Sequence, residues 1–104
     1  MQNLIITRGT TPDVDIELPF DTSALAEAYI SFTQVGRIVI ERAIEDMTLK
    51  GTHLSFRLTQ LETLKLSDKF NVEIQARFKL VDNTLLASYI YEANVGRIIK
   101  EGVI

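Results

Sequence analysis

The stretch Phe70-Asn71-Val72-Glu73-Ile74-Gln75-Ala76-Arg77-Phe78-Lys79-Leu80 alternates apolar and polar residues without exception. A period of two is typical of a β-strand with one face against a core and the other face in water. The six apolar side chains would face inward, and the five polar or charged side chains between them would face the solvent. The stretch therefore predicts an antiparallel sheet that packs on a second layer and is solvated on its outer face.

Shorter alternating segments on both sides of this stretch predict further strands. Turn-forming residues such as glycine, proline and asparagine separate them, as they do between short antiparallel strands. The expected strands are Leu4–Ile6, Asp13–Phe20, Ala28–Thr33, Arg37–Arg42, Met47–Leu49, His53–Leu58 and Leu85–Ala93. Together with residues 70–80 they make about 7–8 strands, which predicts an all-β fold of the sandwich type.

Two short segments predict helical turns instead of strands. The residues Asp21-Thr22-Ser23 can cap one turn over Ala24–Glu27, because a side-chain oxygen can accept from the free amides of a helix start. Thr59 followed by Glu62 has the form of a capping box. We expect this second turn to cross between the two sheets.

The composition indicates one ordinary globular domain over residues 1–104. Of the 104 residues, 46% are hydrophobic and 24% are charged, so a core can form without a metal or a disulfide. The 11 Lys and Arg against 14 Asp and Glu leave no basic field for a phosphate backbone, which argues against nucleic acid as a partner. The absence of cysteine excludes disulfides and sulfur-based zinc sites, and it fits a reducing cytoplasm.

The apolar runs predict neither export nor a membrane span. Residues 1–8 lack a basic start, a long apolar stretch and a small-residue cleavage site, so we expect no signal peptide and a product that starts out in the cytoplasm. No uninterrupted apolar run approaches the roughly 20 residues that cross a bilayer.

No constellation of residues predicts catalysis or a bound cofactor. His53 is the only histidine, so the usual multi-histidine metal site cannot form, and we expect a surface residue. Asp13, Asp15 and Glu17 share one strand face and could bind calcium, but we prefer a solvated strand edge. No serine lies in a nucleophile-elbow pattern, and residues 8–12 have too few glycines for a phosphate loop. We therefore expect no enzymatic activity.

Residues 95–104 form a C-terminal segment that is more apolar than a solvated tail usually is. Its apolar side chains include Ile98, Ile99, Val103 and Ile104. These residues either dock on their own domain or form an interface with another subunit.

Three tyrosines are candidates for exposed binding surfaces. Tyr89 and Tyr91 would share one face of the last strand, and Tyr29 lies on another strand. Aromatic rings of this kind can carry carbohydrate, but we prefer a role for Tyr89 and Tyr91 in a seam between layers or in a subunit contact.

Several motifs, taken in order, resemble those of a known group of proteins. They are Arg8-Gly9-Thr10-Thr11-Pro12, Leu58-Thr59-Gln60-Leu61-Glu62-Thr63-Leu64, the alternating strand, Ala87-Ser88, and Val95-Gly96-Arg97-Ile98 through Gly102-Val103-Ile104. The chain resembles small proteins encoded in bacteriophages and prophages of Gram-positive bacteria. More distantly, it is similar to the N-terminal immunoglobulin-like domain of phage baseplate upper proteins, which attaches a receptor-binding apparatus to the baseplate.

This resemblance implies an immunoglobulin-like antiparallel β-sandwich that serves as a structural protein of a phage tail or baseplate. It implies a location in the virion after synthesis in the host bacterial cytoplasm, and partners among other virion subunits or further copies of the chain. No shaft or receptor-binding region follows the domain, so we expect no direct binding of a receptor. The alternative function is a carbohydrate-binding or adhesion module.

Overall fold

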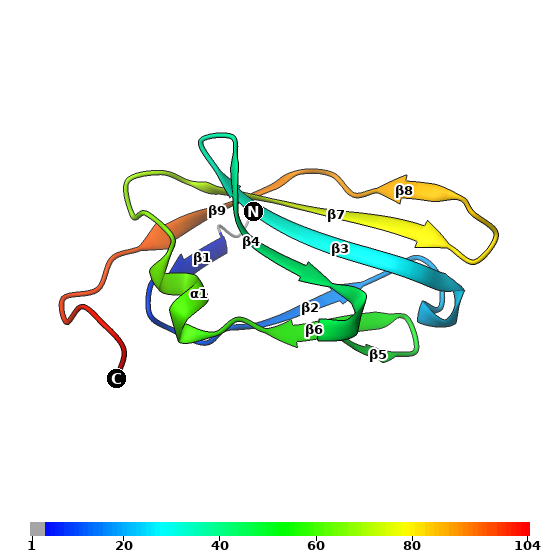
Figure 1. Cartoon of the computed structure of the whole chain (residues 1–104), viewed down its shortest axis with the longest axis horizontal. Coiled ribbons are helices and arrows are strands. Elements are labelled where there is room, and N and C mark those ends of the chain that lie inside the picture. The colour runs from blue at the N-terminus through cyan, green and yellow to red at the C-terminus, as the bar shows by residue number, and fades with distance from the viewer. Residues whose placement is uncertain (1–3) are drawn as a thin grey trace.

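The computed structural model describes residues 4–104, which form two facing β-sheets (Figure 1). The larger sheet contains β1 (Leu4–Thr7), β3 (Leu25–Gln34), β4 (Arg37–Ala43), β7 (Val72–Leu80), β8 (Leu85–Ala87) and β9 (Tyr91–Gly96). The smaller sheet contains β2 (Asp13–Glu17), β5 (Thr48–Lys50) and β6 (His53–Arg57). One short helix, α1 (Gln60–Leu64), and two 3-10 turns, Thr22–Ala24 and Ile44–Asp46, connect strands.

The strand order is that of a sandwich built from hairpins and crossovers. The larger sheet runs β1-β9-β7-β3-β4, with β8 also paired to β7, and the smaller sheet runs β2-β6-β5. All pairs are antiparallel except β1 with β9, which are parallel in the register Leu4↔Ala93 to Thr7↔Gly96. Hairpin turns at Val35-Gly36 and at Gly51 join β3 to β4 and β5 to β6. The predicted antiparallel sandwich is therefore confirmed, with one parallel pair that the sequence did not indicate.

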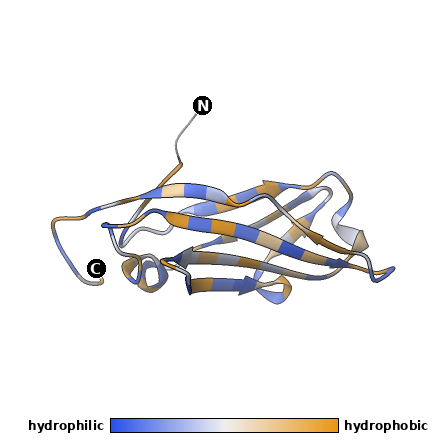
Figure 2. Cartoon of the chain, turned by 90° about the horizontal axis from the view of Figure 1, so that it is seen from above, coloured by the Kyte–Doolittle hydropathy of each residue, from blue (hydrophilic) through white to orange (hydrophobic). Residues whose placement is uncertain are grey.

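The core lies between the sheets and is built by the alternation visible along the strands in Figure 2. On β7, Val72, Ala76 and Phe78 are buried, and Ile74 and Leu80 pack partly buried against the same core. Phe70 is different, because it is 52% exposed and precedes the strand. The prediction that the strand begins at Phe70 is therefore wrong by two residues.

A buried amide explains why this strand starts late. The side chain of Gln34, at the end of β3, donates to the carbonyls of Ser67 and Phe70 and accepts from the amide of Ser67. Gln34 is only 7% exposed, and these bonds satisfy its polar atoms. These bonds hold the residues before β7 in a turn, although their alternation of apolar and polar residues predicts a strand.

Two more predictions need correction. The expected helical turn over Ala24–Glu27 lies earlier, at Thr22–Ala24, where Asp21 accepts from the amide of Ser23. Leu25 already belongs to β3, because it pairs with Leu80 on β7. The expected strand Leu85–Ala93 is split into β8 and β9 by a break at residues 88–90.

Helix α1 closes one end of the sandwich, and the predicted capping box is present. Thr59 accepts from the amide of Glu62, and the Glu62 carboxylate accepts from the amide of Thr59. Glu62 also forms an ion pair with Arg42 of β4, and hydrogen bonds from Arg42 hold the pKa of Glu62 below its usual range. Thr63 is fully buried and donates to the carbonyl of Thr10, which ties the helix to the β1–β2 loop.

The core can be tested with two matched isoleucines. The Ile30→Ala change should lower the free energy of unfolding by about 2–5 kcal/mol, because a buried side chain leaves a cavity. The Ile38→Ala change on the neighbouring strand should cost less than about 1 kcal/mol, because Ile38 is 58% exposed whereas Ile30 is fully buried. Urea denaturation of both variants measures the difference, and equal losses would contradict this placement of Ile30.

Candidate interaction groove

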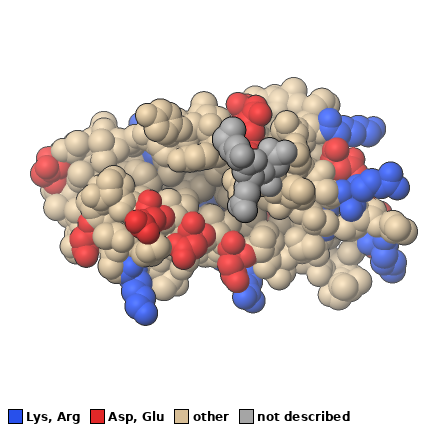
Figure 3. All heavy atoms as spheres, turned by 180° about the vertical axis from the view of Figure 1, so that it is seen from behind, with Lys and Arg blue, Asp and Glu red and all other residues tan. Residues whose placement is uncertain are grey.

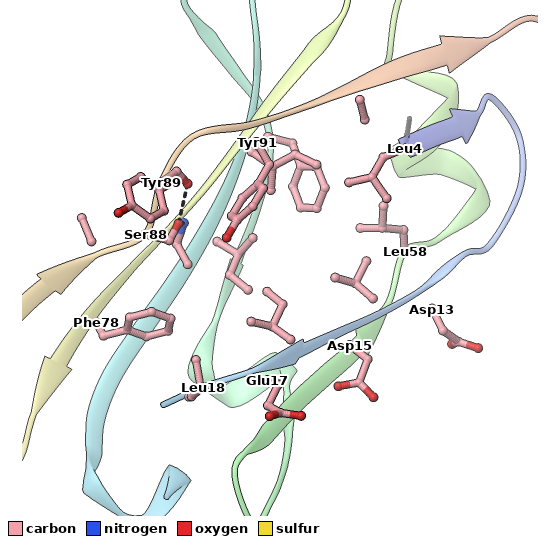
Figure 4. Close-up of a pocket in the computed structure, with 18 of the residues that line it drawn as sticks. Leu4, Asp13, Asp15, Glu17, Leu18, Leu58, Phe78, Ser88, Tyr89 and Tyr91 are labelled. Atoms are coloured by element: carbon pink, nitrogen blue, oxygen red, sulfur yellow. Dashed lines mark hydrogen bonds between the residues drawn. The ribbon is translucent and has the colours of Figure 1, made fainter. Parts of the chain in front are cut away.

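A groove of about 1000 Å³ opens between the two sheets on the side of β2, β8 and β9. Figure 3 shows this face as a hollow, with acidic side chains gathered along its lower border. Figure 4 shows β2 on one side of the hollow and the β8–β9 segment on the other. We call it the seam groove. Its lining includes Leu4, Val14, Ile16, Leu18, Ile30, Phe32, Leu58, Phe78, Leu86, Ser88, Tyr89 and Tyr91.

One wall of the seam groove is the strand β2. Val14 and Ile16 alternate with acidic residues along this strand, face the other sheet and are half-buried against the core. Ile30 and Phe32, which are buried, lie deeper in the groove. The sequence placed Val14 and Ile16 correctly on the inner face but did not indicate that the core is open beside them. Pro19 follows this strand closely in the sequence and favours an edge position, and β2 is an edge strand.

The opposite wall is formed where the last strand breaks at Ser88. The Ser88 hydroxyl accepts from the amide of Ala76 at 2.9 Å and donates to the carbonyl of Tyr89 at 2.8 Å. The side chain therefore takes the place of a backbone acceptor opposite β7, and the chain bulges there. Nothing in the sequence marked Ser88 for this role.

The break decides where the tyrosines lie. Tyr89 falls in the break and is 85% exposed, and Tyr91 begins β9 and is 53% exposed. The expectation that they share a face of one continuous strand is therefore wrong, because no single strand contains both. Both nevertheless line the seam groove. Tyr29 does not join them, since it alternates with the buried Ile30 on β3 and so faces away from the core.

The outer face of β2 carries three carboxylates, Asp13, Asp15 and Glu17, which we call the acidic stripe. In Figure 4 they extend from β2 on the side away from the groove interior. Asp13 forms an ion pair with Arg57 at 2.8 Å. His53 approaches Asp15 at 2.9 Å through Nδ1 and Glu17 at 3.2 Å through Nε2. Residues 4–104 hold no group of three or more acidic or histidine side chains placed to bind a metal ion.

These contacts shift the pKa values of the groups involved. The hydrogen bond from Arg57 lowers the pKa of Asp13. The hydrogen bond between His53 and Asp15 raises the pKa of His53, and the charges of Asp15 and Glu17 add to this effect. Three carboxylates thus face one arginine and one histidine, so the stripe keeps a net negative charge.

The C-terminal segment lies at the α1 end, to the left of the helix in Figure 1, and does not line the seam groove. Ile98 is partly buried, and its Cδ1 would lie 3.1 Å from a Cβ placed on Gly9. Because Gly9 also has φ of +72°, a side chain there would be both strained and crowded. By contrast, Ile99, Val103 and Ile104 are exposed.

Few contacts hold the rest of the segment to the domain. Arg8 forms an ion pair with Glu101, and the amide of Ile104 donates to the side chain of Gln60. Arg8 also donates to the carbonyls of Leu64 and Leu66, at the C-terminal side of α1. The structure therefore docks the segment on its own domain at Ile98 and leaves three of the four candidate interface residues open to solvent.

No helix in residues 4–104 is long and apolar enough to cross a membrane.

No protein-family model matches the chain, and no curated protein matches it either. Solved structures do match, 12 chains in all. One is the immunoglobulin-like domain of mouse leukocyte-associated immunoglobulin-like receptor 1, in a strand-swapped dimer; the TM-score is 0.51 and the identity 15%, over 89% of this chain and 86% of that one. The prediction of an immunoglobulin-like β-sandwich is confirmed.

The histidine of the acidic stripe gives a test of the geometry at this edge. His53 should titrate above its ordinary value of 6.5, and Asp15→Asn should move its pKa back toward that value. Since folding raises this pKa, His53 adds stability that is fully present below the unfolded pKa and is lost as the pH rises through the folded pKa.

A proton NMR titration measures this pKa directly, because His53 is the only histidine. Asp13→Asn is the matched control, since Asp13 pairs with Arg57 and not with His53. A wild-type pKa at or below 6.5 would contradict the pairing.

Proposed function

We propose that this chain is a non-enzymatic protein-interaction module, and specifically a structural subunit of a phage or prophage particle of the tail or baseplate type. The observation that carries the interaction role is the seam groove. It is apolar, it opens the core of a sandwich to solvent, and exposed tyrosines stand on one wall. Large apolar surfaces of this kind mark sites of association with other proteins.

The chemistry of the groove supports a role in binding rather than in catalysis. Among the described residues that line the groove, Ser88 alone carries a serine or threonine hydroxyl. Both hydrogen-bonding partners of this hydroxyl are backbone groups. His53 does not line the groove. A serine nucleophile would need a free hydroxyl with a base beside it.

The virion assignment depends on the sequence resemblance to small phage and prophage proteins. The immunoglobulin-like fold agrees with that resemblance but is shared by many proteins of other functions. The receptor domain that resembles this chain forms a strand-swapped dimer, which is a precedent for association of such domains through their strands. The proposal places the chain in the particle after synthesis in a bacterial cytoplasm.

The proposal can be tested in particles purified by density gradient from induced cultures of the strain that encodes the chain. Mass spectrometry should detect the chain in the particle fraction. The double change Tyr89→Ala and Tyr91→Ala should remove it from that fraction, because both rings stand on the wall of the seam groove. Tyr29→Ala is the matched control, since Tyr29 is 42% exposed and lies outside the groove.

A chain that stays in the soluble cell fraction and never enters particles would contradict the virion role. Equal incorporation of the double variant and the wild type would contradict the role of the groove.

A carbohydrate-binding or adhesion module is the second candidate, because Tyr89 and Tyr91 present exposed aromatic rings beside a hollow. Sugar rings stack on such surfaces through their apolar faces. A glycan array on which the wild type binds and the double tyrosine variant does not would favour this function over the virion role.

A further inference from the structure

In the part of the chain that the structure describes, no strand lies beside the edge of β2 that faces the seam groove. On its other edge β2 pairs with β6 from Asp13↔Arg57 to Glu17↔His53. Within residues 4–104 no strand pairs with the groove side of β2, and β8 pairs only with β7. Immunoglobulin constant-type sandwiches have a four-stranded sheet, one strand more than the smaller sheet has here. The backbone donors and acceptors on the open edge can therefore bind an added strand.

The groove is also suited to the side chains of such a strand. An added strand would direct every second side chain toward Val14, Ile16 and Tyr91, and farther in toward the buried Ile30 and Phe32. Apolar side chains there would bury apolar surface, which favours binding. A lipid chain could fill the same space, but it offers no hydrogen bonds to the edge of β2. An extended peptide can both fill the groove with apolar side chains and hydrogen-bond to the open edge of β2.

The acidic stripe determines which strand fits. The side chains of an added strand that point away from the groove would lie beside Asp13, Asp15 and Glu17. Opposite charges on neighbouring strands stabilise a pair, and like charges directly opposite destabilise it. Two copies of β2 paired edge to edge in antiparallel fashion would place these carboxylates against each other. The stripe therefore disfavours pairing between two β2 edges and favours a strand that carries lysine or arginine.

We infer that the seam groove and the open edge of β2 receive an extended segment of a partner protein in which apolar residues alternate with basic ones. This inference rests on the proposed interaction role and specifies the chemistry of the partner. The apolar residues enter the groove, the basic residues pair with the acidic stripe, and the backbone adds a fourth strand to the smaller sheet.

The test uses a fluorescent peptide of about seven residues, a usual strand length, in which lysine alternates with valine. It should bind the full chain, whereas a peptide that alternates glutamate with valine should not. Amide exchange followed by NMR should show new protection on β2, because the peptide pairs with its open edge. A peptide that bound only through charge would leave these amides unchanged.

Two triple variants distinguish the effect of the acidic stripe on peptide binding from the effect of net charge. Asp13→Asn with Asp15→Asn and Glu17→Gln should weaken binding of the lysine peptide by about tenfold or more. The control is Glu27→Gln with Glu41→Gln and Glu73→Gln, three exposed residues on the strands of the larger sheet. It removes the same charge and should leave the affinity unchanged.

Three outcomes would overturn the inference. The first is equal binding of the two peptides. The second is chemical-shift changes confined to residues away from β2, β8 and β9. The third is no binding of the lysine peptide. Oligomers of the chain alone that disappear on deletion of residues 98–104 would instead assign the groove to the C-terminal segment of a second copy. If the lysine peptide fails but the tyrosine double variant is still lost from particles, the inference fails and the proposed function stands.

Discussion

The unequal width of the two sheets is the constraint on which this structure depends. A six-stranded sheet faces a three-stranded one, and the smaller sheet cannot cover the whole apolar face of the larger. Burial of that face drives folding, so an uncovered part must lie at an edge. It lies beside β2, where the seam groove exposes Val14 and Ile16 on one side and Leu86 and Tyr91 on the other. The groove is thus a consequence of the strand count.

Polar contacts determine that the opening is on this side and not at α1. At the helix, Thr63 donates to Thr10 and Arg8 donates to two carbonyls at the C-terminal side of α1, so the crossover and the β1–β2 loop are held together. Arg42 joins β4 to the same helix through Glu62. A partly buried ion pair of this kind resists separation, because breaking it leaves a charge without a partner. No comparable clamp joins β2 to the β8–β9 segment among the contacts of residues 4–104.

The sequence predicted most of the strands because their alternation is local, and the capping box at Thr59 is equally local. It could not predict features that depend on partners distant in the chain. Gln34 keeps Phe70 out of β7, and Ser88 interrupts the last strand, through hydrogen bonds with residues 12 to 36 positions away. The sequence could not predict the seam groove for the same reason. Alternation shows which face of β2 is apolar, but only the pairing of the sheets shows that no strand of residues 4–104 lies beside its open edge.

The acidic stripe has two physical effects at one edge. Edge strands invite unwanted pairing, and charges with nearby prolines are common means of preventing it. Asp13, Asp15 and Glu17 serve that purpose against a second β2, since like charges would meet. The same charges favour a strand of opposite sign, and Arg57 and His53 neutralise them only in part. Protection against self-pairing and selection of a basic partner therefore follow from one arrangement of side chains, so an edge can be closed to its own copies and open to another chain.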